Sequence, residues 1–488
     1  MRVFVTGATG FIGRALIPLL QREGHSVIAW VRSEARARSL LGADVEIVPT
    51  GHGFDTLVAA LERCDAVVNL AGEPIMVGRW TAARRAVLAD SRIAVTDLLV
   101  RAVAEARRRP RVLISGSAVG YYGDRAGELL AESSSAGDDF LAQLCQRWEH
   151  SAQQAESLGV RVVKLRTGIV LGRAGGALAR MLPPFELGVG GPIGAGSQYL
   201  AWIHLHDLVK IVAVALVDHR YRGAVNAVAP EQATSRSFAR ALGRALRRPA
   251  IVRLPALALK TIFGQAAVVL LASQRVEPRT LVQHAFTFEF PTLDAALGDI
   301  VGGTAVTISP AQSPPEDAGE ARYELRTRTV VQAPIDETFA FFSKAANLGL
   351  ITPAAMQFSI EGQVPPMSEG ATIDYRVRVG PVPVRWRTRI TRWEPSRRFV
   401  DLQESGPYRL WWHEHTFEAD GDVTVMEDHV YYSPPFGFVG GLANLLFIGP
   451  TLRNIFRYRG DVIRLRFGAS SPLRSRHLRA IEGRARVV

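Results

Sequence analysis

The hydrophobic pattern divides the chain into two parts with different periodicities. In residues 1–302, short β-branched runs alternate with longer segments whose apolar positions recur at helical spacing, as in residues 11–23 and 90–107. Such alternation is typical of a parallel sheet with helices packed on its faces. The expected strands are residues 2–6, 26–31, 66–70, 111–115 and 161–165.

A change of pattern follows residue 302. Residues 303–320 contain several prolines and few large apolar side chains, which predicts a linker. Residues 321–468 then show a strand, a helix, a series of runs with a period of two and a long final helix. This order predicts an α+β domain in which a curved antiparallel sheet wraps around the terminal helix. Residues 469–488 are expected to be a disordered basic tail.

Composition and charge limit the classes of protein to consider. With two cysteines, Cys64 and Cys145, the 488-residue chain has neither a disulfide framework nor a cysteine-rich metal site, and a cytoplasmic location is expected. The net charge is +12, but ten arginines against two acids lie in residues 451–488 alone. No aromatic-interleaved basic motif accompanies them, so nucleic acid is not expected as a partner.

Two apolar stretches, residues 254–273 and 436–456, approach the length of a membrane span. Polar residues interrupt both, so neither provides the ~20 continuous apolar residues that a spanning helix needs. A peripheral membrane contact through the second stretch or the basic tail stays open.

A glycine-rich turn at residues 6–13 (TGATGFIG) is the strongest chemical signal. It lies between an expected strand and an expected helix, which is the context that a dinucleotide-binding fingerprint requires. Its glycines permit a tight turn, close approach of the backbone to a pyrophosphate, and close packing of helix on strand. The free N–H groups at the start of the helix would face the phosphates. The residues expected to contact the cofactor are Gly7, Thr9, Gly10, Phe11, Ile12 and Gly13.

The end of the second expected strand indicates which dinucleotide binds. NAD-binding proteins usually place an acidic residue there to bond the ribose 2′-hydroxyl, whereas this chain has Arg32. A guanidinium matches a 2′-phosphate through charge-assisted hydrogen bonds. The sequence therefore favours NADP(H) over NAD(H), although Glu34 lies close by.

These features, with several further motifs, resemble the extended short-chain dehydrogenase/reductase superfamily and imply a Rossmann-type fold. Residues 69–72 (NLAG) look like its fourth-strand motif, which would place Leu70, Ala71 and Gly72 beside the adenosine. Residues 115–123 (SGSAVGYYG) look like the loop that supplies the catalytic serine, here Ser117. Residues 166–172 (RTGIVLG) and 273–288 narrow the resemblance to an atypical epimerase/dehydratase-like subgroup that includes sugar-nucleotide epimerase-like proteins. Arg166 is counted among the cofactor-binding residues.

One element of the superfamily pattern is missing. Typical members carry Tyr-x-x-x-Lys, in which the lysine helps the tyrosine to transfer a proton. None of the four lysines of this chain follows a tyrosine at that spacing, and the corresponding helix offers Leu141 and Cys145 instead. Tyr121 and Tyr122 remain candidates for proton transfer beside Ser117, or for a pocket wall without a catalytic role.

Residues 321–468 resemble the START-like (SRPBCC, polyketide cyclase-like) fold, which implies a cavity for a hydrophobic molecule between sheet and helix. Alternation places aromatic and histidine side chains on one face of the expected strands. His413 and His415 share a strand face, but no third ligand is evident nearby in the sequence, so no metal site is predicted. The candidate cavity residues are Trp386, Trp411, His413, His415 and Phe417.

Two functions follow from these expectations. The first is an NADP(H)-dependent oxidoreductase or epimerase-like enzyme that acts on a small molecule and carries a fused ligand-binding domain. The second is a non-catalytic NADP(H)-responsive binding or regulatory protein, which the missing Tyr-x-x-x-Lys motivates. The sequence names neither the substrate nor the oligomeric state.

Overall fold

A computed structural model describes residues 1–42, 44–173, 175–379, 382–435 and 437–468. The chain forms two compact units, Met1–Gly302 and Gly303–Val488, which are described separately as unit 1 and unit 2. The predicted tail at residues 469–488 lies outside the described residues.

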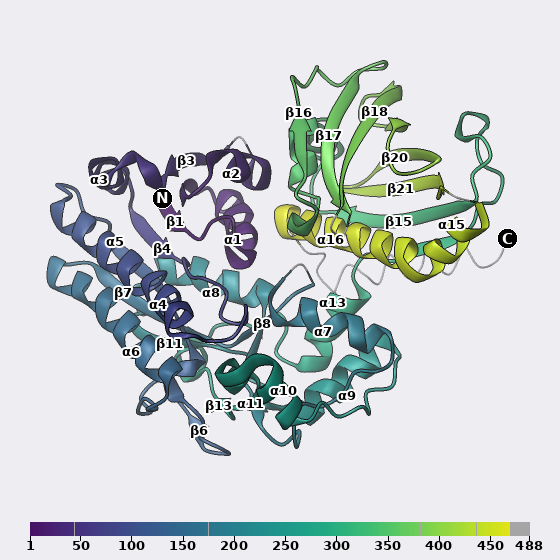
Figure 1. Cartoon of the computed structure of the whole chain (residues 1–488). Helices are drawn as coiled ribbons and strands as arrows, with labels where there is room; N and C mark the ends of the chain where they lie inside the picture. Colours follow the sequence, from purple (N-terminus) through teal and green to yellow (C-terminus); the bar gives the residue numbers. More distant parts are fainter. Residues whose placement is uncertain (43, 174, 380–381, 436, 469–488) are drawn as a thin grey trace. The chain divides into compact units, whose positions relative to one another are not determined.

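Unit 1 is built on a seven-stranded parallel sheet with the order β11-β7-β5-β4-β1-β2-β3 (Figure 1). The five strands expected from the sequence are present, and two strands that the pattern did not reveal, β3 and β11, complete the edges. Strand order reverses between β1 and β4, so a crevice is expected beyond their carboxyl ends. The strands are β1 (Arg2–Thr6), β2 (Ser26–Val31), β3 (Glu46–Pro49), β4 (Ala66–Asn69), β5 (Val112–Ala118), β7 (Arg161–Thr167) and β11 (Gly223–Ala227).

Helices cover both faces of this sheet because its strands are apolar on both sides (Figure 1). Helices α3 (Phe54–Glu62), α5 (Ile93–Glu105) and α6 (Phe140–Gln153) pack on one another on one face. Helices α1 (Phe11–Arg22) and α8 (Leu205–Val217) pack together on the other. This double winding fixes the loops at the carboxyl edge, where the predicted cofactor residues lie.

The remaining elements of unit 1 are short strands and helices, several of which follow β7. The short strands are β6 (Leu129–Leu130), β8 (Ile169–Leu171), β9 (Tyr199–Leu200), β10 (Trp202–His204), β12 (Ala233–Thr234) and β13 (Arg275–Val276). The other helices are α2 (Glu34–Leu41), α4 (Ala82–Asp90), α7 (Gly176–Glu186), α9 (Ser235–Leu246), α10 (Ala256–Phe263), α11 (Val268–Leu271), α12 (Arg279–Gln283) and α13 (Leu293–Gly302).

Unit 2 is an eight-stranded sheet, antiparallel throughout, with the order β14-β15-β21-β20-β19-β18-β17-β16 (Figure 1). Its strands are β14 (Val306–Pro310), β15 (Tyr323–Val331), β16 (Ser359–Glu361), β17 (Thr372–Val379), β18 (Val382–Glu394), β19 (Arg398–Ser405), β20 (Leu410–Asp420) and β21 (Val423–Ser433).

The predicted linker at residues 303–320 is wrong in its first half. Residues Val306–Pro310 form edge strand β14, which pairs with β15, and Val306 and Ile308 join the core beneath it. The prolines suggested a linker, but Pro310 is the last residue of an edge strand, a position where proline removes no necessary hydrogen bond.

Helices α14 (Ile335–Phe342), α15 (Gly437–Ala443) and α16 (Gly449–Phe467) complete unit 2. Pro450 lies at the start of α16, after a short π-helical turn at residues Asn444–Ile448. Proline is tolerated there because the first N–H groups of a helix have no partner within it. Helix α16 packs against β14 and β15, and its apolar side chains help to bury the core of the sheet (Figure 1). No helix among the residues with assigned structure is long and apolar enough to cross a membrane.

Candidate functional site

The glycine turn lies where the sequence placed it, between β1 and the amino end of α1. Gly7 has φ +67°, and a Cβ there would be 2.5 Å from the carbonyl oxygen of Leu70. A Cβ on Gly13 would be 2.4 Å from the carbonyl oxygen of Gly7. No side chain caps α1, whose N-cap residue is the exposed Gly10. The turn is therefore as tight as a phosphate-binding turn must be, and it leaves the helix start open to an anion.

The loop after β4 is fastened beside this turn. The hydroxyl of Thr6 donates to Asn69 Oδ1 at 2.6 Å and accepts from the N–H of Ala71 at 3.1 Å. The amide of Asn69 in turn donates to the hydroxyl of Thr96 at 2.8 Å. These bonds hold the loop with Leu70, Ala71 and Gly72 against the glycine turn, at the crevice that the strand order creates.

Arg32 lies at the end of β2 and extends into solvent. Its side chain is 86% exposed and forms an ion pair with Glu73, at 3.2 Å. Glu73 directly follows the loop after β4 and also pairs with Arg84. A surface pair of this kind contributes little stability, so the guanidinium is free to exchange Glu73 for a phosphate.

Arg166 has the opposite environment, and its role in cofactor binding stays a prediction. Its side chain is 5% exposed and its guanidinium binds both oxygens of Glu149, at 2.8 and 3.0 Å. It also donates to the hydroxyl of Tyr122 and to the carbonyl of Glu132, both at 3.0 Å. Burial would lower the pKa of Arg166, but the hydrogen bonds and charge of Glu149 outweigh it and raise that pKa. Four of the five N–H groups of this guanidinium therefore bind protein partners, which favours a structural role over contact with a phosphate.

Ser117 lies at the end of β5 and joins the same network. Its hydroxyl donates to Glu149 Oε1 at 2.7 Å, and the side chain is largely buried. Glu149 is on α6, so the helix that carries Tyr-x-x-x-Lys in typical superfamily members contributes a carboxylate here. Leu141 and Cys145 also lie on α6, and burial raises the pKa of the Cys145 thiol to about 12, which keeps it neutral.

The two neighbouring tyrosines have different environments. Tyr122 is fully buried, and its hydroxyl donates to Asn226 at 2.7 Å while accepting from Arg166. Burial raises the pKa of Tyr122, and no face of its hydroxyl is left for a substrate, which argues against Tyr122 as a proton donor. The ring of Tyr121 is half-buried and lies 3.4 Å beneath the Arg166 guanidinium. Tyr121 alone of the pair borders solvent.

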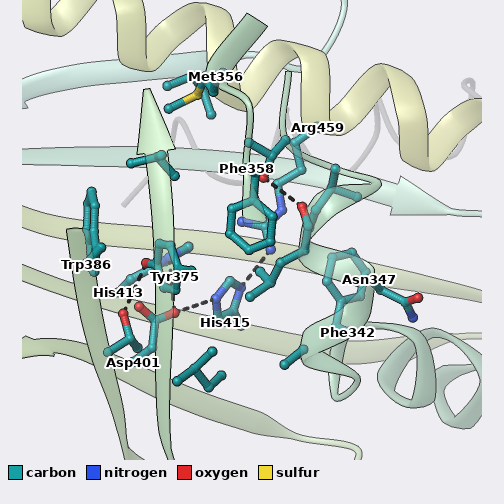
Figure 2. A pocket seen from close by; sticks show the side chains of 18 of the residues that line it. Phe342, Asn347, Met356, Phe358, Tyr375, Trp386, Asp401, His413, His415 and Arg459 are labelled. Carbon is teal, nitrogen blue, oxygen red and sulfur yellow. Dashed lines mark hydrogen bonds and ion pairs between the residues drawn. The ribbon is translucent and has the colours of Figure 1, made fainter. Parts of the chain in front are cut away.

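Unit 2 encloses a cavity of about 390 Å³ between the sheet, α14 and α16 (Figure 2). Four of the five predicted cavity residues line it: Trp386, Trp411, His413 and His415. Most of the wall is apolar or aromatic, as in a site for a small hydrophobic molecule. Other lining residues include Phe342, Leu348, Ile351, Met356, Phe358, Tyr375, Ile390, Tyr408 and Phe456.

Phe417, the fifth predicted residue, is not part of the cavity wall. It lies on the same face of β20 as His415 but one step further along, where its ring packs edge-on against Phe339 of α14 at 5.3 Å between centroids. It belongs to the core cluster beneath that helix. Alternation correctly predicted which face of β20 carries Phe417. Helix α14 packs against Phe417 on that face, so the cavity does not extend to this residue.

A polar cluster forms one part of the cavity wall (Figure 2). Asp401 on β19 lies opposite His413 on β20, and Asp428 on β21 lies opposite His415. Arg459 reaches the cluster from α16 and lies 3.4 Å from Asp428. Burial, with a contribution from the neighbouring His415, lowers the pKa of His413 to about 4, so this ring is neutral at physiological pH.

The sequence did not reveal Asp401 and Asp428 as neighbours of the two histidines. No third ligand is evident near His413 and His415 in the sequence, but in the structure Asp401 lies beside both rings. The Oδ2 of Asp401 is 3.1 Å from His415 Nε2 and 3.4 Å from His413 Nδ1. Alternation along β19 from the buried Phe399 would have placed Asp401 on the inner face, but only the strand register shows that it meets the histidines.

The sheet order and the glycine turn define unit 1 as a Rossmann-type domain. Comparison with known families agrees: the NAD dependent epimerase/dehydratase family matches residues 3–227, and a domain of unknown function (DUF1731) matches residues 254–300. The chain is 41% identical over 306 residues to the Bos taurus epimerase family protein SDR39U1, an alignment that covers 62% of this chain and 100% of that protein. The chain belongs to the NAD dependent epimerase/dehydratase family.

Solved structures show the same relationship. The human epimerase family protein SDR39U1, crystallised with NADPH, is 38% identical with a TM-score of 0.56, over 62% of this chain and 99% of that one. A Bacillus cereus UDP-glucuronic acid 4-epimerase variant with NAD bound is 18% identical with a TM-score of 0.51, over 62% and 98% of the two chains. The second likeness concerns the fold alone.

Proposed function

We propose that unit 1 binds NADP(H) and is an oxidoreductase or epimerase-like enzyme acting on a small molecule. The observation that carries the proposal is the uncapped amino end of α1 beside a glycine turn in which Gly7 and Gly13 have no space for a Cβ. The human relative that was crystallised with NADPH supports the choice of cofactor. Bound nicotinamide would supply hydride chemistry.

The chain's own residues would hold the cofactor and orient the substrate. The backbone of residues 7–13 would bind the pyrophosphate, the loop of residues 70–72 would border the adenosine, and Arg32 would bind the 2′-phosphate. Ser117 would orient a substrate oxygen, with Glu149 holding the serine hydroxyl at 2.7 Å. Tyr121 would form the wall beside it.

A second function has a specific observation in its favour. The hydroxyl of Tyr122 is enclosed, the hydroxyl of Ser117 is turned toward Glu149, and none of the four lysines follows a tyrosine at the Tyr-x-x-x-Lys spacing. A protein that binds NADP(H) without turnover, as a redox-responsive binding protein, would have this arrangement.

For unit 2 we propose a START-like domain that binds a hydrophobic small molecule. The support is an antiparallel sheet with a long carboxyl-terminal helix and a cavity of about 390 Å³ lined mainly by aromatic and aliphatic side chains. The indole N–H of Trp386, on that wall, has no hydrogen-bond partner among the described residues. It would serve a polar atom of the ligand.

One experiment separates the two functions of unit 1. The purified full chain is titrated with NADPH by calorimetry and then incubated with NADPH and a panel of carbonyl compounds and nucleotide sugars, with and without Ser117→Ala. An enzyme shows saturable binding, and loss of reduced nicotinamide or epimerised product that Ser117→Ala abolishes. Tight binding without any conversion supports the binding protein, and absence of binding refutes both.

A further inference from the structure

We propose that Asp401, His413 and His415 bind one divalent transition-metal ion, such as Zn²⁺, in the wall of the unit 2 cavity. Their ligand atoms, one carboxylate oxygen and one nitrogen from each ring, all lie within 4.8 Å of one another. Zn²⁺ binds such atoms at about 2.0 to 2.2 Å, so tetrahedral ligands lie about 3.3 Å apart. The distances of 3.1 and 3.4 Å from Asp401 to the two rings match that spacing.

The ring nitrogens of both histidines face carboxylate oxygens. His413 and His415 lie 3.4 and 3.1 Å from Asp401, and 3.1 and 2.8 Å from Asp428. A metal ion bound by His413 Nδ1, His415 Nε2 and Asp401 Oδ2 would take the place of the bond between His415 Nε2 and Asp401. Arg459, 3.4 Å from His415 Nδ1, adds a positive charge to the same group.

Asp428 supplies the outer support that metal-binding histidines usually have. When the nitrogens facing Asp401 are the ligands, His413 Nε2 and His415 Nδ1 face Asp428 instead. A carboxylate that accepts the second N–H of a ligating histidine fixes its tautomer and orientation. Asp428 is itself held by the hydroxyl of Thr327 at 3.0 Å and by Arg459.

The backbone and the charge also favour an ion. The aspartates and histidines come from three adjacent strands with fixed pairing, so the site exists before any ligand arrives. Two carboxylates, Asp401 and Asp428, lie beside one guanidinium, Arg459, at a mostly apolar cavity wall. Three protein ligands leave coordination positions open, and Figure 2 shows the three side chains at the pocket, where water or an oxygen of a bound molecule would complete the shell.

The inference is independent of the cofactor of unit 1 and of the molecule that fills the cavity. Within the described part of the chain, these three residues are the one group of three or more histidine, cysteine and acidic side chains with ligand atoms this close together. Substitution of any of the three should therefore weaken metal binding at this site.

The test uses the untagged full chain, stripped with a chelator and titrated with ZnCl₂ by calorimetry. We expect one Zn²⁺ per chain, with affinity lowered at least about 100-fold by Asp401→Asn or His415→Gln, and about 10- to 100-fold by Asp428→Asn. The controls are Asp374→Asn and His429→Gln, on β17 and β21 of the same sheet, which pair with Arg387 and Glu324 away from the cavity wall. They should bind Zn²⁺ as the wild type does.

Visible absorption of the Co²⁺-loaded wild-type chain keeps the test decisive if a variant does not fold. Intense bands of a four- or five-coordinate ion with nitrogen ligands support the site, and the weak spectrum of hydrated Co²⁺ overturns it. Absence of saturable Zn²⁺ binding by the wild type, or unchanged binding by folded Asp401→Asn, also overturns it.

Discussion

Each unit contains a buried polar cluster built around charged side chains, and the two clusters differ in the groups they contain and in what they border. In unit 1, Arg166 and Glu149 neutralise each other through two hydrogen bonds, and Ser117 and Tyr122 also bond to this pair. Four of the five N–H groups of Arg166 bind protein acceptors. The cluster therefore braces β5, β7 and α6 without a ligand.

The cluster of unit 2 combines two carboxylates with two histidines at a cavity. Asp401 and Asp428 face the ring nitrogens of His413 and His415, and the group borders a cavity rather than a packed core. The difference shows that burial and charge alone do not identify a binding site. The useful criterion is whether metal-ligating atoms of several side chains meet beside an open space.

Removing one half of the matched pair should have the largest effect. Glu149→Gln leaves the buried Arg166 charge uncompensated and should destabilise unit 1 by about 3 to 5 kcal/mol. Denaturant unfolding of the full chain measures this loss, because the transition of unit 1 shifts to lower denaturant concentration. Glu156→Gln, an exposed neighbour beyond the end of α6, is the control and should leave the transition unchanged. Equal stability of the two variants would show that the pair is not a structural brace.

The cluster of unit 2 should be stabilised by an added metal ion, whereas the cluster of unit 1 needs no ligand. Zn²⁺ at about 100 times its Kd should stabilise unit 2 by about 2.7 kcal/mol, measured as a rise in the melting transition of that unit. Asp401→Asn should abolish this rise, because it removes one of the three proposed ligands. A rise of the same size in folded Asp401→Asn would contradict the assigned site.

Two arginines extend the comparison to the cofactor. Arg32 is exposed, whereas Arg166 is enclosed, so only Arg32 is available to a 2′-phosphate. Arg32→Ala should weaken NADPH binding about 10- to 100-fold and leave NADH binding unchanged, as calorimetry can show. Arg220→Ala, in the loop before β11 at the opposite edge of the sheet, should change neither. Equal weakening of both nucleotides by Arg32→Ala would refute the phosphate assignment.

The tyrosine pair should give the smallest effect. Tyr122→Phe removes a hydroxyl that bonds Asn226 and Arg166, and should cost about 1 to 2 kcal/mol of stability without changing NADPH affinity. Tyr121→Phe keeps the ring under Arg166 and should leave stability unaltered in the same unfolding experiment. If Tyr121→Phe lost stability and Tyr122→Phe did not, the environments assigned to the two tyrosines would be wrong.

Local pattern predicted the parts of the molecule that depend on local chemistry. The glycine turn and the five expected strands of unit 1 were correct, because glycine spacing and β-branched runs act within a few residues. Strand β14 was missed because its apolar positions, Val306 and Ile308, lie among prolines that usually indicate a linker. Its pairing with β15 is a tertiary preference that the segment alone does not express.

The site residues also differ in how far they depend on contacts with distant parts of the chain. Nothing local distinguishes Tyr121 from Tyr122, since the partners that bury Tyr122 lie in β7 and β11. Arg166 was assigned to the cofactor for a comparable reason: its carboxylate partner is on α6, outside its own motif. Asp401 became a candidate ligand only when register placed it opposite His413.

Anomalous diffraction at the zinc edge, from crystals of the full chain grown with Zn²⁺, tests the contrast between the clusters most directly. The account predicts a peak bonded to Asp401 Oδ2, His413 Nδ1 and His415 Nε2, and none at the Arg166–Glu149 cluster. Density without zinc between Asp401 and the two rings, or zinc bound only elsewhere on the chain, would contradict it.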